Sequence, residues 1–169
     1  MAALPKRVCW DACTWIALIQ KENVVVGGNL EDRYTMCRSV INVASNGGVE
    51  IIVSGLCFVE VCKNPGVNAS SEDKIAAFFE NDYIVAVAVD RYVGTRARGL
   101  MLAKYPGLKP PDAVHLATAL ITNADEFNTF DDALLALDGK VIRDDGVALK
   151  ICKPGNSGPA MPLLDQAGV

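Results

Sequence analysis

Short apolar runs alternate with segments of helical periodicity along most of this chain. The runs that read as buried strands cover residues 7–11, 49–53, 83–89 and 125–130, with one further strand expected within 141–152. Helices are expected between them, at residues 12–21, 30–45, 56–63, 70–81, 91–105, 111–119 and 133–137. Strands that alternate with helices pair in parallel, because each helix carries the chain back to the same edge of the sheet. The sequence therefore predicts an α/β fold of three layers (α/β/α) around a central, mostly parallel sheet of four to five strands.

The length of 169 residues and the hydrophobic content of 51% fit one compact domain. We expect that domain at residues 1–152, followed by a tail at residues 153–169 that is rich in proline and glycine. No apolar stretch near a strand is long enough to cross a bilayer, and the first residues lack the apolar core of a signal peptide. A soluble, cytoplasmic protein without a membrane partner is the expectation that follows.

The cysteine and histidine pattern argues against a zinc site. The only histidine is His115, and no C-x-x-C pair occurs among the six cysteines. Zinc sites require paired Cys or His ligands at short spacing. We expect the cysteines to be free thiols, mostly buried, in a reducing compartment.

Four acidic residues each lie at or just past the end of an apolar run. They are Asp11, Glu60, Asp112 and Asp131. A carboxylate beside an apolar strand is costly unless something compensates its charge, and parallel sheets collect their sites at the carboxyl ends of the strands. A cluster of carboxylates without a histidine pair favours Mg²⁺ or Mn²⁺. Such ions support displacement at phosphorus, because they activate water and stabilise the leaving oxygen.

Three positions near these acids have two interpretations each. Asp131 and Asp132 are adjacent, and we favour Asp131 for the site because it follows the strand directly, with Asp132 capping the short helix. His115 lies one helical turn after Asp112, so it contacts the substrate or a carboxylate, or is a partly exposed structural histidine. Thr129 orients a water or a phosphate oxygen, or is an ordinary strand threonine.

The net charge of −4 does not favour nucleic acid over the whole surface, but the charges are unevenly distributed. Residues 91–111 contain five basic side chains and no acidic one: Arg91, Arg96, Arg98, Lys104 and Lys109. This stretch leads directly into Asp112, so Arg91, Arg96, Arg98 and Lys109 are candidates for holding a phosphate backbone. The alternative is a solvated helix face.

Four segments of the chain resemble the PIN domain family, close in pattern to the VapC-like toxins of bacterial toxin–antitoxin pairs. They are the strand Val8-Cys9-Trp10-Asp11 running into Ile16-Ala17-Leu18-Ile19, the helix Gly55-Leu56-Cys57-Phe58-Val59-Glu60-Val61, the run from Tyr105 to Ala119, and Asn128-Thr129-Phe130-Asp131. The most specific piece is Asp112-Ala113-Val114-His115-Leu116-Ala117-Thr118-Ala119 within the third segment. The family often has hydroxyl or amide side chains after the first aspartate, where this chain has Ala12 and Cys13.

This resemblance implies a function as well as a fold. Asp11, Glu60, Asp112 and Asp131 would form the acidic metal-binding set of an Mg²⁺- or Mn²⁺-dependent endoribonuclease. Family members commonly cut tRNA or rRNA, form homodimers and are blocked by a small antitoxin protein.

Two other functions remain open at this point. A phosphatase using Asp11 as nucleophile would need a second aspartate two residues later, where this chain has Cys13. A non-catalytic RNA-binding or protein-interaction module has no physical reason to keep four mutually repelling acids. The expectation is therefore a metal-dependent ribonuclease, with the non-catalytic module as the alternative.

Overall fold

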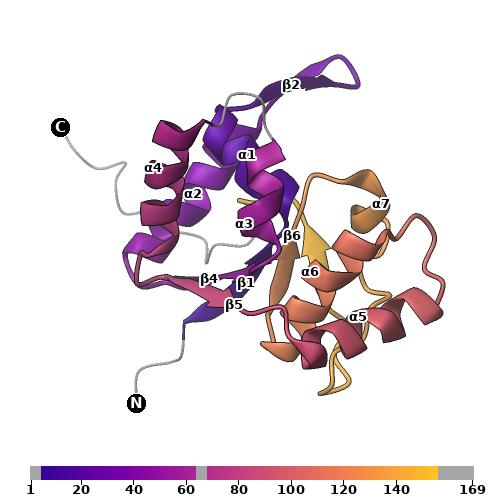
Figure 1. Cartoon of the computed structure of the whole chain (residues 1–169). Coiled ribbons are helices and arrows are strands. Elements are labelled where there is room, and N and C mark those ends of the chain that lie inside the picture. Colours follow the sequence, from indigo (N-terminus) through magenta and orange to yellow (C-terminus); the bar gives the residue numbers. More distant parts are fainter. Residues whose placement is uncertain (1–4, 64–67, 156–169) are drawn as a thin grey trace.

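The computed structural model describes residues 5–63 and 68–155, and a five-stranded parallel sheet lies at its centre (Figure 1). The strand order across the sheet is β5-β4-β1-β6-β7. The strands are β1 (Lys6–Trp10), β4 (Val49–Ser54), β5 (Ile84–Val87), β6 (Glu126–Asn128) and β7 (Lys150–Cys152). All four strand pairings are parallel, which confirms the predicted sheet. Most of the predicted tail, residues 156–169, lies outside the described residues.

Helices cover both faces of the sheet, as the three-layer prediction requires (Figure 1). The helices are α1 (Ala12–Gln20), α2 (Arg33–Ser45), α3 (Cys57–Glu60) with the 3₁₀ turn Val61–Lys63, α4 (Ala69–Phe79), α5 (Arg91–Leu102), α6 (Pro110–Ile121) and α7 (Asp132–Leu135). Val8 and Trp10 of β1 pack with α1, α2 and α4, whereas Cys9 packs with α5 and α6. Side chains of a strand alternate between the faces of the sheet, so β1 contributes to both cores. Within the described chain, no helix has the length and apolar character needed to span a membrane.

The register of the central strands sets where the acidic residues emerge. Trp10, the last residue of β1, pairs with Val53 of β4 and with Asn128 of β6. The residues that follow β1 and β6 are Asp11 and Thr129, so these two side chains leave the sheet at the same edge. Asp11 also begins α1, since its carboxylate accepts a hydrogen bond from the backbone N–H of Thr14.

An antiparallel hairpin replaces the start of one predicted helix. It consists of β2 (Asn23–Val26) and β3 (Asn29–Asp32), joined by Gly27 and Gly28, which both have positive φ. The helix predicted from residue 30 therefore begins at Arg33, where the Asp32 carboxylate accepts a hydrogen bond from the Thr35 N–H at 2.8 Å. The valine run before Gly-Gly is a hairpin signal, because two residues with positive φ match the twist of the paired strands.

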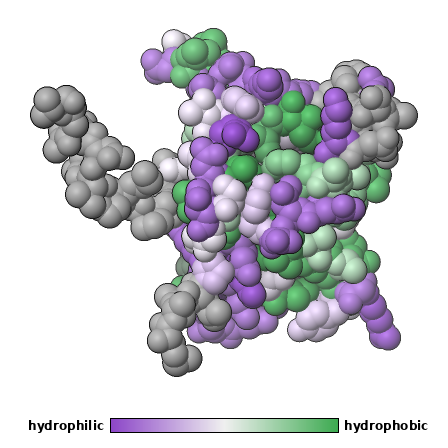
Figure 2. Space-filling model, turned by 90° about the vertical axis from the view of Figure 1, so that its left-hand side faces the viewer, coloured by the Kyte–Doolittle hydropathy of each residue, from purple (hydrophilic) through white to green (hydrophobic). Residues whose placement is uncertain are grey.

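The hairpin projects from the body of the molecule (Figure 1) and carries apolar side chains on its outer surface (Figure 2). Val25 and Leu30 are cross-strand partners, and each is 73% exposed. The other predicted elements differ from the observed ones mainly at their ends, by a few residues. The further strand expected within residues 141–152 is β7, Lys150–Cys152.

Candidate functional site

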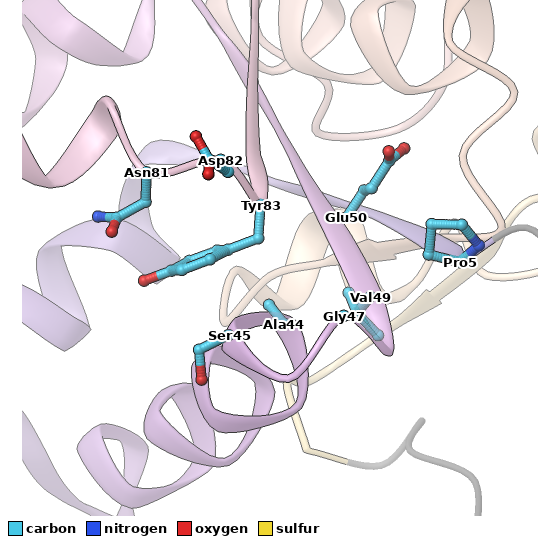
Figure 3. Close-up of a pocket in the computed structure, with 9 residues that line it drawn as sticks. All are labelled: Pro5, Ala44, Ser45, Gly47, Val49, Glu50, Asn81, Asp82 and Tyr83. Carbon is cyan, nitrogen blue, oxygen red and sulfur yellow. The ribbon is translucent and has the colours of Figure 1, made fainter.

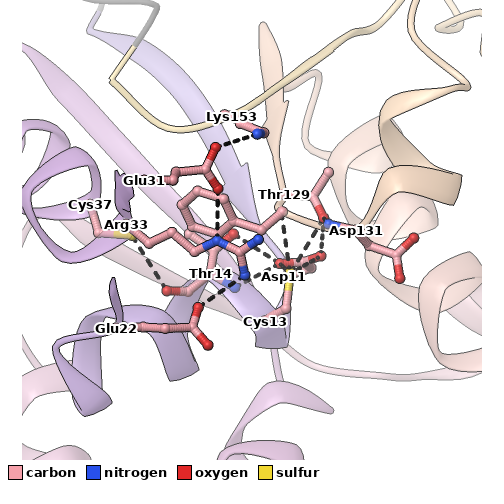
Figure 4. Close-up of polar contacts among 11 residues, drawn as sticks. Asp11, Cys13, Thr14, Glu22, Glu31, Arg33, Cys37, Thr129, Asp131 and Lys153 are labelled. Atoms are coloured by element: carbon pink, nitrogen blue, oxygen red, sulfur yellow. Dashed lines mark hydrogen bonds and ion pairs between the residues drawn. The ribbon is translucent and has the colours of Figure 1, made fainter. Parts of the chain in front are cut away.

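Asp11 has a buried carboxylate, and both of its oxygens accept hydrogen bonds, one from α1 and one from the segment after β6 (Figure 4). Its Oδ1 accepts from the Thr14 N–H at 3.0 Å and from the Thr14 hydroxyl at 2.9 Å. Its Oδ2 accepts from the Thr129 hydroxyl at 2.5 Å. Only 4% of Asp11 is exposed, and these donors offset much of the cost of burying its charge.

Cys13 is a site residue that sequence reasoning did not assign. Its Sγ lies 3.0 and 3.1 Å from the two carboxylate oxygens of Asp11, and it accepts from the Phe130 N–H at 3.3 Å. Burial raises the pKa of the Cys13 thiol, and the charge of Asp11 raises it further. The group therefore stays protonated at neutral pH and donates its S–H to Asp11. The signal in the sequence was its position two residues after the first aspartate, where the related family carries other hydrogen-bonding side chains.

Glu60 and His115 form a hydrogen-bonded pair, in which the histidine is buried and the glutamate is partly exposed. Glu60 is the last residue of α3, and its Oε2 lies 2.7 Å from Nε2 of His115 on α6. The hydrogen bond from His115 lowers the pKa of Glu60, although burial acts in the opposite direction. Nδ1 of His115 has no hydrogen-bond partner within the described residues. The ring proton therefore belongs on Nε2, which donates to the carboxylate.

The expected partial exposure of His115 is wrong, since only 2% of the residue is exposed. Its alternative role as the partner of a carboxylate is the one the structure contains. Burial raises the pKa of the Cys57 thiol, and the charges of Asp11 and Glu60 raise it further.

Asp112 is the third residue of α6 and lies near two other aspartates. Its Oδ2 accepts from the backbone N–H of Lys109, the residue before the helix, at 3.1 Å. Burial raises the pKa of Asp112, and the charges of Asp131 and Asp11 raise it further, against the lowering effect of the Lys109 hydrogen bond. The structure therefore brings Asp11, Asp112 and Asp131 close enough to repel one another.

Asp131 ends the segment after β6 and caps α7. Its Oδ1 accepts from the N–H groups of Ala133 at 2.8 Å and Leu134 at 3.2 Å. Its own N–H donates to the Thr129 hydroxyl at 3.0 Å. The prediction that Asp132 caps this helix is wrong, because Asp132 is already the first helical residue and is exposed.

The predicted phosphate-binding residues differ in position, in partners and in exposure. Lys109 is the cap residue before α6, and its backbone N–H donates to Asp112. Arg96 is bound to Asp144 through Nη2 at 2.6 Å. Arg91 and Arg98 are exposed on α5. Thr129 is fully buried, so its hydroxyl supports Asp11 and does not face solvent.

The donor chemistry of this cluster fits a hard divalent cation. Carboxylate oxygens are the protein ligands that Mg²⁺ and Mn²⁺ prefer, and a cation would relieve the repulsion that raises the pKa of Asp112. Across residues 5–63 and 68–155, however, no three histidine, cysteine or acidic side chains converge closely enough to coordinate one ion. A bound ion would therefore draw Asp112 and Asp131 toward Asp11.

A pocket of about 390 Å³ lies at the opposite edge of the sheet, where the strands begin (Figure 3). It is lined by residues around the starts of β1, β4 and β5, among them Pro5, Val49 and Tyr83. Glu50 and Asp82 are the two carboxylates in its lining. The acidic cluster thus lies at one edge of the sheet, and this pocket at the other.

Comparisons with known proteins agree with the fold. A model of the PIN domain family matches residues 8–140. No curated protein matches the sequence. A solved structure of the Mycobacterium tuberculosis toxin VapC20, described as a Sarcin-Ricin loop cleaving toxin, has a TM-score of 0.56 to this chain. The two are 14% identical over 76% of this chain and 94% of that one, which shows a shared fold. Because the family model spans well over half of its length, the chain belongs to the PIN domain family.

Proposed function

We propose that this protein is a cytoplasmic Mg²⁺- or Mn²⁺-dependent endoribonuclease, the toxin of a toxin–antitoxin pair. The observation that carries the proposal is that Asp11 and Asp131 follow the paired strands β1 and β6 at one sheet edge, and that the charges of both raise the pKa of Asp112. Structural ion-pair networks also shift pKa values, but here the three groups have the same sign. Membership of the PIN domain family and a fold shared with an RNA-cleaving toxin support the same activity.

Asp11, Asp112 and Asp131 would hold the ion, with Glu60 completing the set. Asp112 uses Oδ2 for the Lys109 N–H, and Asp131 uses Oδ1 to cap α7. The second oxygen of each has no other hydrogen bond from the described residues and would be the one to bind. Mg²⁺ or Mn²⁺ bound there supplies the charge that activates water and stabilises the leaving oxygen in phosphodiester hydrolysis.

The remaining residues of the cluster orient the carboxylates. Thr14, Cys13 and Thr129 fix the plane of Asp11. His115 is buried, so it would act by holding Glu60 and not by touching RNA. Ligands held by such outer contacts bind metal more tightly, because less freedom is lost on binding.

The substrate would be single-stranded or structured RNA, with tRNA or rRNA as the first candidates. Lys109, whose backbone N–H donates to Asp112, would contact a phosphate near the scissile bond. Arg91 and Arg98 on α5 would contact flanking phosphates, and Arg96 would do so only after leaving Asp144. A homodimer and a small antitoxin partner complete the proposal, and both come from the family resemblance.

The test is cleavage of total tRNA and rRNA by the purified chain in Mn²⁺ or Mg²⁺, with EDTA as the metal-free reference. Asp112→Asn keeps the shape of the side chain and the acceptor for Lys109, but removes the charge. We expect it to lower the cleavage rate by more than about 100-fold, beyond the usual effect of an outer contact. Asp132→Asn is the matched control, because Asp132 is exposed next to the cluster, and its rate should equal that of the wild type.

Two outcomes would contradict the proposal. Cleavage that persists in EDTA or in Asp112→Asn would place the activity elsewhere. Absence of both cleavage and Mn²⁺ binding in the wild type would favour a non-catalytic module. One observation favours the non-catalytic module: Asp11 and Glu60 already have hydrogen-bond partners within the protein.

A further inference from the structure

The segment 129–131 carries two side chains of the cluster but belongs to no helix or strand. The Thr129 N–H donates to the Cys152 carbonyl at 3.1 Å, and the Asp131 N–H donates to the Thr129 hydroxyl at 3.0 Å. Among the described residues, the Phe130 N–H between them finds only the Cys13 sulfur, at 3.3 Å, and sulfur is a weak acceptor. The middle of the segment therefore has the weakest backbone hydrogen bond.

Arg33 restrains the segment further, because it contacts the side chain of Phe130. The guanidinium carbon of Arg33 lies 4.7 Å from the centroid of the Phe130 ring, and the ring itself is buried. A guanidinium over an aromatic face is attracted by the charge distribution of the ring, more strongly when both are shielded from water. Phe130 stands between Thr129 and Asp131, so fixing its ring limits the movement of both neighbours.

Two glutamates fix the guanidinium in its place over the ring (Figure 4). Nε of Arg33 donates to Glu31 at 2.9 Å, and Nη1 donates to Glu22 at 3.0 Å. Arginine can do this because its planar group offers donors in fixed directions while its face remains free to stack. The side chains of all three residues are mostly buried, with 17–29% exposure. Ion pairs of this kind are screened less than pairs on the open surface.

The base of the hairpin connects this arrangement to the sheet. The Tyr34 N–H donates to the Glu22 carbonyl at 3.1 Å, which closes the hairpin where α1 ends and α2 begins. Lys153, directly after β7, pairs with the second oxygen of Glu31. Arg33, Glu22, Glu31 and Lys153 thus form a network with two positive and two negative charges.

We infer that Arg33 is a positioning residue, which acts through Phe130 to hold Thr129 and Asp131 in place for the acidic cluster. The hairpin is then the support that delivers Arg33 to the site. The effect on metal binding and cleavage rests on the function proposed above, whereas the effect on segment 129–131 does not. A direct contact between Arg33 and RNA is the competing explanation, and it predicts a change in KM alone.

The experiment compares Arg33→Met with Arg38→Met in the full chain. Methionine keeps the length of the apolar stem and removes the charge, and Arg38 is an exposed arginine in the same helix. Hydrogen–deuterium exchange of a peptide covering residues 128–134 reports on the segment without metal or RNA. Titration calorimetry with Mn²⁺ alone gives the metal affinity, and RNA cleavage gives kcat and KM.

We expect Arg33→Met to exchange faster in residues 128–134, to bind Mn²⁺ about tenfold more weakly and to lose kcat, with Arg38→Met unchanged. Phe130→Leu should act in the same direction, and the double variant should be no worse than the stronger single one, because both break one contact. Arg33→Lys keeps the charge but not the planar group, so it should recover part of the loss; it also serves if the methionine variant does not fold.

Three results would overturn the inference. Exchange of residues 128–134 that equals the wild type in Arg33→Met shows that Arg33 does not hold the segment. Losses that add fully in the double variant show that it does not act through Phe130. A change confined to KM identifies a substrate contact. If the wild type neither binds Mn²⁺ nor cuts RNA, the proposed function fails, and the exchange data still decide whether Arg33 holds the segment.

Discussion

At the scale of single residues, the acidic cluster contains negative charge that does not stabilise the folded chain. Asp112 illustrates this, since burial and two nearby aspartates raise its pKa. Its ionised form is therefore less favourable in the folded chain than in the unfolded one. Sites that sacrifice stability in this way are expected where a ligand restores it.

Asp112→Asn should raise the melting temperature in EDTA at pH 7 and leave it nearly unchanged at pH 3. The pKa of Asp112 is raised above its ordinary value of 3.8, so the cost of ionisation is complete above the folded pKa and vanishes below the unfolded one. The rise should be a few degrees at most, since 1 kcal/mol shifts a chain of this size by about 2–4 °C. Calorimetry at both pH values measures it. A melting temperature at pH 7 that falls would show that the charge stabilises the fold.

The sequence predicted the acidic residues better than it predicted their partners. The position of each acid after an apolar run is a local pattern, and parallel strands bring such positions to one edge. The pairing of Glu60 with His115 joins residues of two helices that are 55 positions apart. Such contacts depend on how helices pack on the sheet, which periodicity does not specify.

At the scale of elements, Gly107 brings two parts of the site into contact. It lies in the loop before α6, with φ of +74°, and a Cβ at this position would be 2.9 Å from Cβ of Ala133 in α7. The loop precedes Asp112, and α7 is capped by Asp131. A side chain here would therefore push apart two elements that carry acidic residues.

Gly107→Ala should destabilise the fold by more than Gly146→Ala, which is the matched control. Gly146 also has a positive φ of +82°, but a Cβ there meets nothing within 4 Å. The strained backbone alone should cost about 1 kcal/mol in either variant, and the contact with Ala133 adds to it only in the first. Urea unfolding gives both free energies. Equal losses would mean that α7 moves aside without cost.

The β2–β3 hairpin shows why the sequence pattern does not predict every element. Tyr34, Cys37, Val40 and Ile41 have helical spacing, and extending that pattern backward to Leu30 gave a helix that was too long. The Gly27-Gly28 pair lies outside that helical pattern. Flanked by Val26 and Asn29 it closes a hairpin, and Asp32 then begins the helix.

At the scale of the whole molecule, the sheet separates two edges of different character. The acidic cluster lies where the strands end, and the pocket with Asp82 lies where they begin. The net charge of −4 gives the surface no general attraction for RNA. A divalent ion at the cluster would therefore add positive charge where a phosphate group would bind.

Saturating Mn²⁺ should raise the melting temperature of the wild type, because an ion that binds only the folded chain stabilises it by mass action. The gain is about 2.7 kcal/mol at a concentration of 100 Kd. Asp112→Asn should lose most of this shift, and Asp82→Asn, which changes a carboxylate at the other edge, should keep it. A scan of all three proteins with and without Mn²⁺ measures the effect. Equal shifts in the two variants would locate the ion away from the cluster.

The strand order determines when the chain can complete its fold during synthesis. β1 is synthesised first, but it is the middle strand, and its neighbour β6 is made more than a hundred residues later. The Thr129 N–H then requires the carbonyl of Cys152, in β7, before the segment that carries Asp131 is fixed. In a chain still under synthesis, the acidic cluster is therefore incomplete until β7 can join the sheet. A nuclease of the proposed kind would thus acquire its complete site only after its last strand is released.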